Sequence, residues 1–449
     1  MTELHTVAKR QKKAALIIIA LSVLVIAAII TAAFIVGSEN YERSRLKSAV
    51  NGSLPNSNEA TVADYLIFWN FTSFSEELIE AFEARYQYYY YKEIGDTASV
   101  ARATANYFLD NRFEETYRKG ESAVSEAIAG SYIAAIGDKY GYYRTAAQSN
   151  QFNSTMSGTT IGIGVTVTKD AERGIPIIDV IENSPAMKAG LAAGDIIIAI
   201  DGVSIVGKDY NQSVNKISGE KGTEIEITVK RGESVVTVTA IRDEVIQKTV
   251  SGKMLDNGIG YIKISSFKKN TDELFAEELD KLIDAGAVGI IFDLSVNPGG
   301  YLNSVTNMLS YLTPTGTKLA GFSSAKEDIL STDGTELEPD DRILSVPAVV
   351  ICSQHTASAG ELFTGAIKDF REMGIMNASV VGKTTYKKGV MQSTFSLVGG
   401  ATVTITTAYY LSPLGNNYDE NGVTPDIYVD NETDYLSEAI SEMHRLLSQ

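Results

Sequence analysis

The segment that decides the fold is residues 346–370, which read "VPAVVICSQHTASAGELFTGAIKDF". The apolar run at 346–353 predicts a buried strand, and "ELFTGAIKDF" has the spacing of an amphipathic helix. Ser358 lies between them in a turn of small residues. Hydrolases often place a nucleophilic serine on such a connection between strand and helix. Because a serine hydroxyl is a poor nucleophile without an adjacent base, the next question is which residue activates it.

The chain contains three histidines and one cysteine, which restricts the chemistry available to it. His355 lies at the mouth of the turn, three residues before Ser358, which is an awkward place for a base. His5 precedes a predicted membrane segment, and the late position of His444 does not by itself exclude it. A Ser-His-Asp triad is therefore not favoured. The single cysteine rules out an internal disulfide and a thiolate zinc site, and HExxH is absent, so we expect no metal and no cofactor.

A lysine is the remaining candidate for the base, because burial or a neighbouring cation can lower the pKa of a lysine. The segment 382–392, "GKTTYKKGVMQ", offers two. If it is extended, Lys388 and Gln392 share one face of the strand and Gln392 can orient the amine. This pattern predicts Lys388 as the base. The alternative, that Lys387 and Lys388 are both solvated surface charges, stays open.

Two segments offer backbone N–H groups to an oxyanion. Ser358 opens a helix, so the N–H of Ala359 points at the site with the helix dipole behind it. The turn "NPGG" at 297–300 adds the N–H groups of Gly299 and Gly300 after another predicted buried strand. Read alone, "NPGG" is equally consistent with an ordinary turn.

Residues 14–36 carry no charged side chain and are long enough to span a bilayer core of about 30 Å. Lys9, Arg10, Lys12 and Lys13 flank their N-terminal side, which predicts a single-pass anchor with everything after about residue 37 outside the cytoplasm. A long cleaved signal is the alternative.

The net charge of −17 argues against nucleic acid as the main ligand.

The remaining pattern divides the chain into parts. Residues 158–243 contain short alternating runs bounded by turn signals, and later residues alternate strands with helices. The predicted order is a cytoplasmic tail (1–13), a transmembrane anchor (14–36), a stalk (37–60), a helical N-terminal region (61–157), a β-rich module (158–243), an α/β core (244–430) and a C-terminal helix (431–449).

Taken together, these motifs resemble those of the C-terminal processing peptidases, also called tail-specific proteases. "TASAGE" (356–361) resembles the S-A-S-A-S-E element of that family, and "TTYKKGVMQ" (384–392) resembles T-F-G-K-G-x-x-Q. "FDLSVNPGG" (292–300) resembles D-L-R-x-N-P-G-G, and the end of the core, "YYLSPLGNNYDENGVTPDIYV" (409–429), resembles the trailing element. Within 158–243, "ENSPAMKAGLAAGDIIIAIDG" resembles part of a PDZ domain.

The resemblance implies a fold and an activity. The fold is an α/β catalytic core of the crotonase/Clp-like ββα type, with an inserted PDZ domain, a helical N-terminal region and one transmembrane helix. The activity is that of a serine endopeptidase with Ser358 as nucleophile, Lys388 as base and Gln392 as its orienting partner. It would act at the bacterial cell envelope on proteins with exposed C-terminal tails. The residues that would bind the tail carboxylate are Gly162, Ile163, Gly164 and Val165.

The chain departs from the family pattern at three positions. Ser295 replaces the arginine of D-L-R, Gly360 replaces the third serine of the repeat, and Lys387 replaces the glycine before the base. These departures keep a second function open, that of a catalytically silent PDZ scaffold that binds protein tails. A Ser-Lys acyl transferase acting on small molecules is disfavoured, because the SDN and KTG motifs are missing. The sequence leaves open a homodimer and an activating partner protein.

Overall fold

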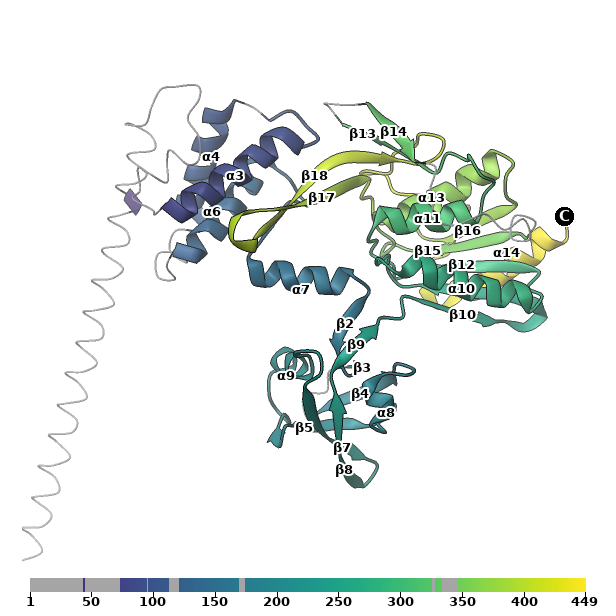
Figure 1. Ribbon diagram of the computed structural model, residues 1–449. Helices are drawn as coiled ribbons and strands as arrows, with labels where there is room; N and C mark the ends of the chain where they lie inside the picture. Colours follow the sequence, from purple (N-terminus) through teal and green to yellow (C-terminus); the bar gives the residue numbers. More distant parts are fainter. Residues whose placement is uncertain are drawn as a thin grey trace, which may run out of the picture. The chain divides into compact units, whose positions relative to one another are not determined.

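The computed structural model describes residues 43–44, 73–94, 96–112, 121–168, 174–324, 328–332 and 346–449 (Figure 1). The chain forms two compact units. The first comprises residues up to Ala146 together with Gln392–Thr406, and the second comprises Ala147–Met391 and Thr407–Gln449.

The first unit is mainly helical. Its elements are α3 (Ser73–Tyr89), α4 (Thr97–Asn111), α6 (Glu121–Ile136) and β1 (Tyr142–Arg144), which pairs with β18 (Thr402–Leu411). Phe82 and Tyr132 form an edge-to-face aromatic pair in its core, with ring centroids 5.5 Å apart. The buried carboxylate of Asp138 accepts bonds from the hydroxyl and the N–H of Thr406 at 2.6 and 3.1 Å, which ties the helices to β18.

A β-rich module follows α7 (Ala146–Met156) in the second unit. β2 (Thr159–Gly162) pairs with β9 (Asp243–Ile246), and a separate sheet has the order β3-β4-β5-β7-β8, with β6 paired to β5. In β7 the buried residues Ile225, Ile227 and Val229 alternate with more exposed ones, as expected for a strand with one face in the core. The elements of this sheet and its two helices are β3 (Val165–Val167), β4 (Ile175–Val180), α8 (Pro185–Lys188), β5 (Ile196–Ile200), β6 (Val203–Ser204), α9 (Tyr210–Ile217), β7 (Glu224–Arg231) and β8 (Ser234–Ile241).

The rest of the second unit is built on a six-stranded sheet of order β10-β11-β12-β15-β16-β19. The strands β11, β12, β15, β16 and β19 are parallel, and β10 is antiparallel to β11. Its strands are β10 (Val250–Met254), β11 (Ile259–Ile264), β12 (Gly289–Asp293), β15 (Ala348–Cys352), β16 (Ala378–Gly382) and β19 (Ile427–Tyr428).

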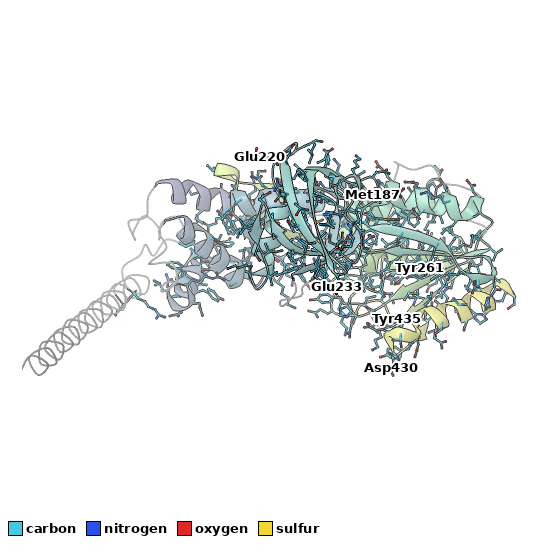
Figure 2. All side chains as sticks on the ribbon, turned by 90° about the horizontal axis from the view of Figure 1, so that it is seen from below. Met187, Glu220, Glu233, Tyr261, Asp430 and Tyr435 are labelled. Atoms are coloured by element: carbon cyan, nitrogen blue, oxygen red, sulfur yellow. The ribbon has the colours of Figure 1, made fainter. Side chains whose placement is uncertain are left out.

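Helices cover both faces of this sheet. One face packs against α10 (Thr271–Asp284), α11 (Leu302–Tyr311) and α13 (Ala359–Glu372), and the other against α14 (Tyr435–Leu447), which begins at Tyr435 in the view of Figure 2. Every residue of β12, β15 and β16 is buried, which explains why these strands read as continuous apolar runs. A smaller sheet joins β13 (Ala320–Ser323), β14 (Asp328–Thr332) and β17 (Val390–Ser396) to β18.

The predicted mixed α/β architecture is confirmed, including the terminal helix, and β17 pairs with β18 across a turn that contains Gly399 and Gly400. The predicted anchor at 14–36 and most of the predicted stalk lie outside the described residues. Within the residues that the structure does describe, no helix has the length and apolar character needed to cross a membrane. The predicted domain boundaries stay predictions.

Candidate active site

Three neighbouring parallel strands deliver the candidate site residues. β12 ends at Asp293 and leads to the turn at 297–300, β15 ends at Cys352 and leads to Ser358, and β16 ends at Gly382 and leads to Lys388. Because parallel strands end at the same edge, segments far apart in the sequence meet there (Figure 1). The candidate nucleophile, base and oxyanion donors therefore follow adjacent strands.

Ser358 has an unusual backbone conformation. Its φ and ψ are 55° and −118°, a region that side chains rarely adopt, and α13 begins at the next residue. The residue is half-buried, whereas Ala357 and Ala359 are buried on either side. A strained turn that leads directly into a helix is an arrangement in which hydrolases often place a nucleophilic serine.

A buried carboxylate, that of Glu361, connects the two candidate catalytic segments. One of its oxygens, Oε2, accepts the N–H groups of Ser358 and Lys388, each at 2.8 Å. The other, Oε1, accepts the N–H of Lys387 at 2.7 Å and the hydroxyl of Thr385 at 2.6 Å. Glu361 has no solvent exposure. Burial raises its pKa, while the four donors act in the opposite direction by stabilising the carboxylate.

The segment that carries Lys388 is a loop. β17 begins at Val390, so the strand alternation expected to place Lys388 and Gln392 on one face does not reach Lys388. That part of the sequence argument is wrong, because the N–H groups of 387 and 388 turn inward to Glu361 instead of joining a ladder. Lys388 is half-buried, and Gln392 is half-buried on β17.

The residues after β18 hold this loop from another side. The N–H of Gly389 donates to Asp419 Oδ1 at 3.1 Å, and its carbonyl accepts from the Asn417 amide at 2.8 Å. A Cβ at Gly389 would lie 2.1 Å from the backbone nitrogen of Asp419, so only glycine fits there. The close approach explains the glycine that follows the candidate base.

The turn at 297–300 supplies one free N–H group rather than two. The N–H of Gly299 donates to Asn297 Oδ1 at 2.8 Å, and Asn297 is fully buried. Among the described residues, the N–H groups of Gly300 and Ala359 have no acceptor. Gly299 still lies against the turn at Ser358, because a Cβ added to it would be 3.0 Å from that of Ser358. Gly300 and Ala359 are thus the pair able to meet a developing negative charge.

The three positions that depart from the family pattern have different local surroundings, and nothing in the structure explains the lysine at 387. Lys387 has φ of 78°, a left-handed conformation that favours glycine. Ser295 donates its N–H to Asp293 at 2.9 Å, and the Tyr261 hydroxyl donates to the other oxygen of that carboxylate. A Cβ at Gly360 would lie 3.1 Å from Thr356 Cγ2, so the helix start there is tightly packed.

The two described histidines, His355 and His444, are not positioned to act as the base. The imidazole of His355 is 59% exposed, and its Nε2 is 3.9 Å from a carboxylate oxygen of Glu432. His444 is exposed on α14, which covers the opposite face of the sheet from α13. His5 lies outside the described residues. No cluster of three or more metal-ligating side chains occurs within the described ranges.

A second candidate site is a groove in the β-rich module. It lies along β3 and α9 and contains the four residues predicted to bind a tail carboxylate, Gly162 to Val165. β3 is an edge strand of its sheet, and Val214 and Ile217 line the groove from α9, followed by Ser218. An open strand edge beside an apolar helix face can accept an extended peptide as an added strand.

Sequence reasoning missed Glu361 and Asn297 as organising residues. Glu361 stands three positions after Ser358, where a glutamate often reaches back to the N–H of the residue that caps a helix, so this contact could have been expected. Its bonds to Thr385, Lys387 and Lys388 carry no local signal, because they depend on how β15 and β16 pair.

Two family models match parts of the chain. Residues 258–429 match the model of peptidase family S41, and residues 177–231 match a PDZ domain model. The chain is 31% identical to the carboxy-terminal processing protease CtpA of Bacillus subtilis over 68% of this chain and 64% of that protein. It is 30% identical to a probable CtpA-like serine protease of Staphylococcus epidermidis over 70% of this chain and 63% of that protein.

The chain thus spans less than two thirds of the length of these relatives. Among solved structures, a photosystem II D1 C-terminal processing protease has a TM-score of 0.44 and 23% identity, covering 80% of this chain and 94% of that chain. The predicted resemblance to C-terminal processing peptidases is confirmed.

Proposed function

We propose that the chain is a serine endopeptidase of the C-terminal processing type, because residues 258–429 match the model of peptidase family S41 and residues 177–231 match a PDZ domain model. It binds protein substrates by their C-terminal tails and cleaves them with a Ser/Lys dyad. The observation that carries the proposal is the shared acceptor Glu361 Oε2, which fixes the backbones of Ser358 and Lys388 to one atom.

In the proposed reaction, the neutral amine of Lys388 takes the proton of the Ser358 hydroxyl as Oγ attacks the scissile carbonyl. The N–H groups of Ala359 and Gly300 stabilise the resulting oxyanion, since the N–H of Gly299 is already bonded to Asn297. Collapse of the tetrahedral intermediate releases the new amine with a proton from Lys388. Water then attacks the acyl-enzyme, with Lys388 again as base. Gln392 orients the amine.

The groove along β3 and α9 is the proposed site for the substrate tail. The tail adds to the open edge of β3, its apolar side chains contact Val214 and Ile217, and its carboxylate meets backbone N–H groups of Gly162 to Val165. Gly164 fits this role because its φ is 83° and a Cβ there would lie 2.4 Å from that of Ser184. Main-chain pairing tolerates many tail sequences, whereas the apolar helix face selects apolar ones.

The proposed location is the outer side of a bacterial cell membrane, with residues 14–36 as a single-pass anchor. The support is the uncharged segment and the basic residues that precede it. The acidic remainder of the chain fits a protein that works on other proteins rather than on nucleic acid.

The alternative is a PDZ scaffold that binds tails without cleaving them. The two functions differ in one measurement on the full chain purified in detergent. It is incubated with an unfolded protein that ends in an apolar tail, beside its Ser358→Ala, Lys388→Ala and Lys387→Ala variants, and fragments are identified by mass spectrometry. We expect cleavage by the wild type and Lys387→Ala only. Tail binding with no cleavage by any version would favour the scaffold, and full activity in Ser358→Ala would overturn the proposed site.

A further inference from the structure

The hydroxyl of Tyr410 lies between the carbonyl groups of the two proposed catalytic residues. It is 2.7 Å from the carbonyl oxygen of Lys388 and 3.0 Å from that of Ser358. Tyr410 belongs to β18, and its side chain is fully buried. A phenol has one proton to donate, so the two carbonyls share it.

This contact mirrors the one made by Glu361. Glu361 Oε2 receives the N–H groups of Ser358 and Lys388, and the Tyr410 hydroxyl faces their C=O groups. Each of the two residues is therefore held at both its N–H and its C=O by the same two side chains. Both side chains are excluded from solvent, where a hydrogen bond is stronger and an unpaired carbonyl is costlier.

We propose that Tyr410 is a positioning residue, whose hydroxyl sets the separation between the Ser358 hydroxyl and the Lys388 amine. The inference rests on the proposed peptidase function and assigns to Tyr410 no contact with the substrate. Proton transfer requires donor and acceptor within hydrogen-bond reach, so a loop shift of even one ångström slows the reaction strongly.

The rest of the loop is held independently of this hydroxyl. The backbone N–H of Tyr410 donates to the carbonyl of Gly389 at 3.2 Å, and the Asn417 amide donates to the carbonyls of Gly389 and Tyr410 at 2.8 and 2.6 Å. Removing the hydroxyl alone leaves β18 paired and the ring in place. The change is then confined to the relative position of Ser358 and Lys388.

Tyr410→Phe tests the inference, with Tyr435→Phe as its control. Tyr435 is also a buried tyrosine, at the start of α14 (Figure 2), and its hydroxyl has no partner among the described residues. In the full chain, Tyr410→Phe is expected to lower kcat about tenfold to a hundredfold with KM unchanged. The rising limb of its pH–rate profile should move to higher pH. A loosened loop admits water, and water favours the protonated form of the Lys388 amine. Tyr435→Phe should match the wild type.

Labelling of Ser358 by a fluorophosphonate provides a second readout that needs no protein substrate, and Tyr410→Phe should slow it by a similar factor. A Tyr410→Phe variant with wild-type kcat and labelling rate would overturn this inference alone. So would a loss of activity that only tracks the unfolded fraction while the pH profile keeps its position. A wild-type chain that neither cleaves nor is labelled would overturn the proposed function, and the inference with it.

Discussion

The backbone N–H groups of Ser358 and Lys388 end on one atom, Oε2 of Glu361, each at 2.8 Å. The two residues follow different strands, β15 and β16, which pair in parallel register. A single buried oxygen therefore links strand pairing to the spacing of the proposed nucleophile and the proposed base. Fixed backbone contacts of this kind can speed a reaction, because they hold the reacting groups in the right geometry before the substrate binds.

Glu361→Gln should disable the site and destabilise the fold. A glutamine presents an NH₂ group to donors that need an acceptor, so at least two of the four bonds are lost in a fully buried place. Each unsatisfied buried donor costs about 1–3 kcal/mol, so we expect the free energy of unfolding to fall by about 2–4 kcal/mol. Chemical denaturation and peptidase rates measure the two effects.

The control for Glu361→Gln is Glu277→Gln, at a carboxylate whose side chain is 61% exposed and paired with Lys281. It should change stability by less than about 1 kcal/mol and leave turnover intact. Equal behaviour of the two variants would contradict the role given to Glu361.

Lys387→Gly should keep activity and slightly raise stability. A left-handed conformation costs a residue with a Cβ about 1–2 kcal/mol, and glycine removes this cost. The greater freedom of glycine in the unfolded chain offsets about 0.5–1 kcal/mol of that gain. The expected net gain is about 0.5 kcal/mol, measured by thermal unfolding. Lys383→Gly, at a residue outside that region, should lose stability instead. A loss at Lys387 as large as that at Lys383 would mean that its side chain, not its backbone, matters.

Asp195→Asn should show a pH-dependent loss of stability in the PDZ domain. Arg231 donates to both Asp195 oxygens at 2.7 Å, and this pairing lowers the pKa of the carboxyl group. A lowered folded-state pKa gives stability that is present above the unfolded value of about 3.9 and is lost as pH falls through the folded value. The difference in stability between the wild type and Asp195→Asn should therefore be largest near neutral pH and become smaller in acid.

Differential scanning calorimetry at neutral pH and below pH 4 measures this difference. Glu233→Gln, at an exposed carboxyl in the β7–β8 turn (Figure 2), serves as the control and should show no such difference at either pH. A stability difference between the wild type and Asp195→Asn that grows on acidification would contradict the lowered pKa of Asp195.

Val214→Asp should weaken tail recognition without touching the chemistry. Val214 lines the groove from α9, where a carboxylate would face an apolar tail and repel its terminal charge. We expect KM for a tail-bearing substrate to rise about tenfold or more, with the rate of fluorophosphonate labelling unchanged. Val235→Asp, at a valine 65% exposed on β8, is the control. If both variants behave like the wild type, the tail binds elsewhere.

The sequence predicts the strands and the turn at Ser358 because their signals are local. The apolar run before Ser358 becomes β15, and the amphipathic run after it becomes α13. It does not predict that Lys388 precedes its strand, since the inward turn of the loop comes from Glu361 on another element. The engagement of the Gly299 N–H by Asn297 likewise depends on a side chain whose direction no periodicity encodes.

The most direct test of the Ser/Lys dyad is the site and rate of covalent labelling. The full chain in detergent is treated with a fluorophosphonate, digested, and mapped by mass spectrometry, together with Ser358→Ala, Lys388→Ala and Lys387→Ala. We predict an adduct on Ser358 that forms at the wild-type rate in Lys387→Ala, at least a hundredfold more slowly in Lys388→Ala, and not at all in Ser358→Ala. An adduct on another serine, or undiminished labelling in Lys388→Ala, would contradict the dyad.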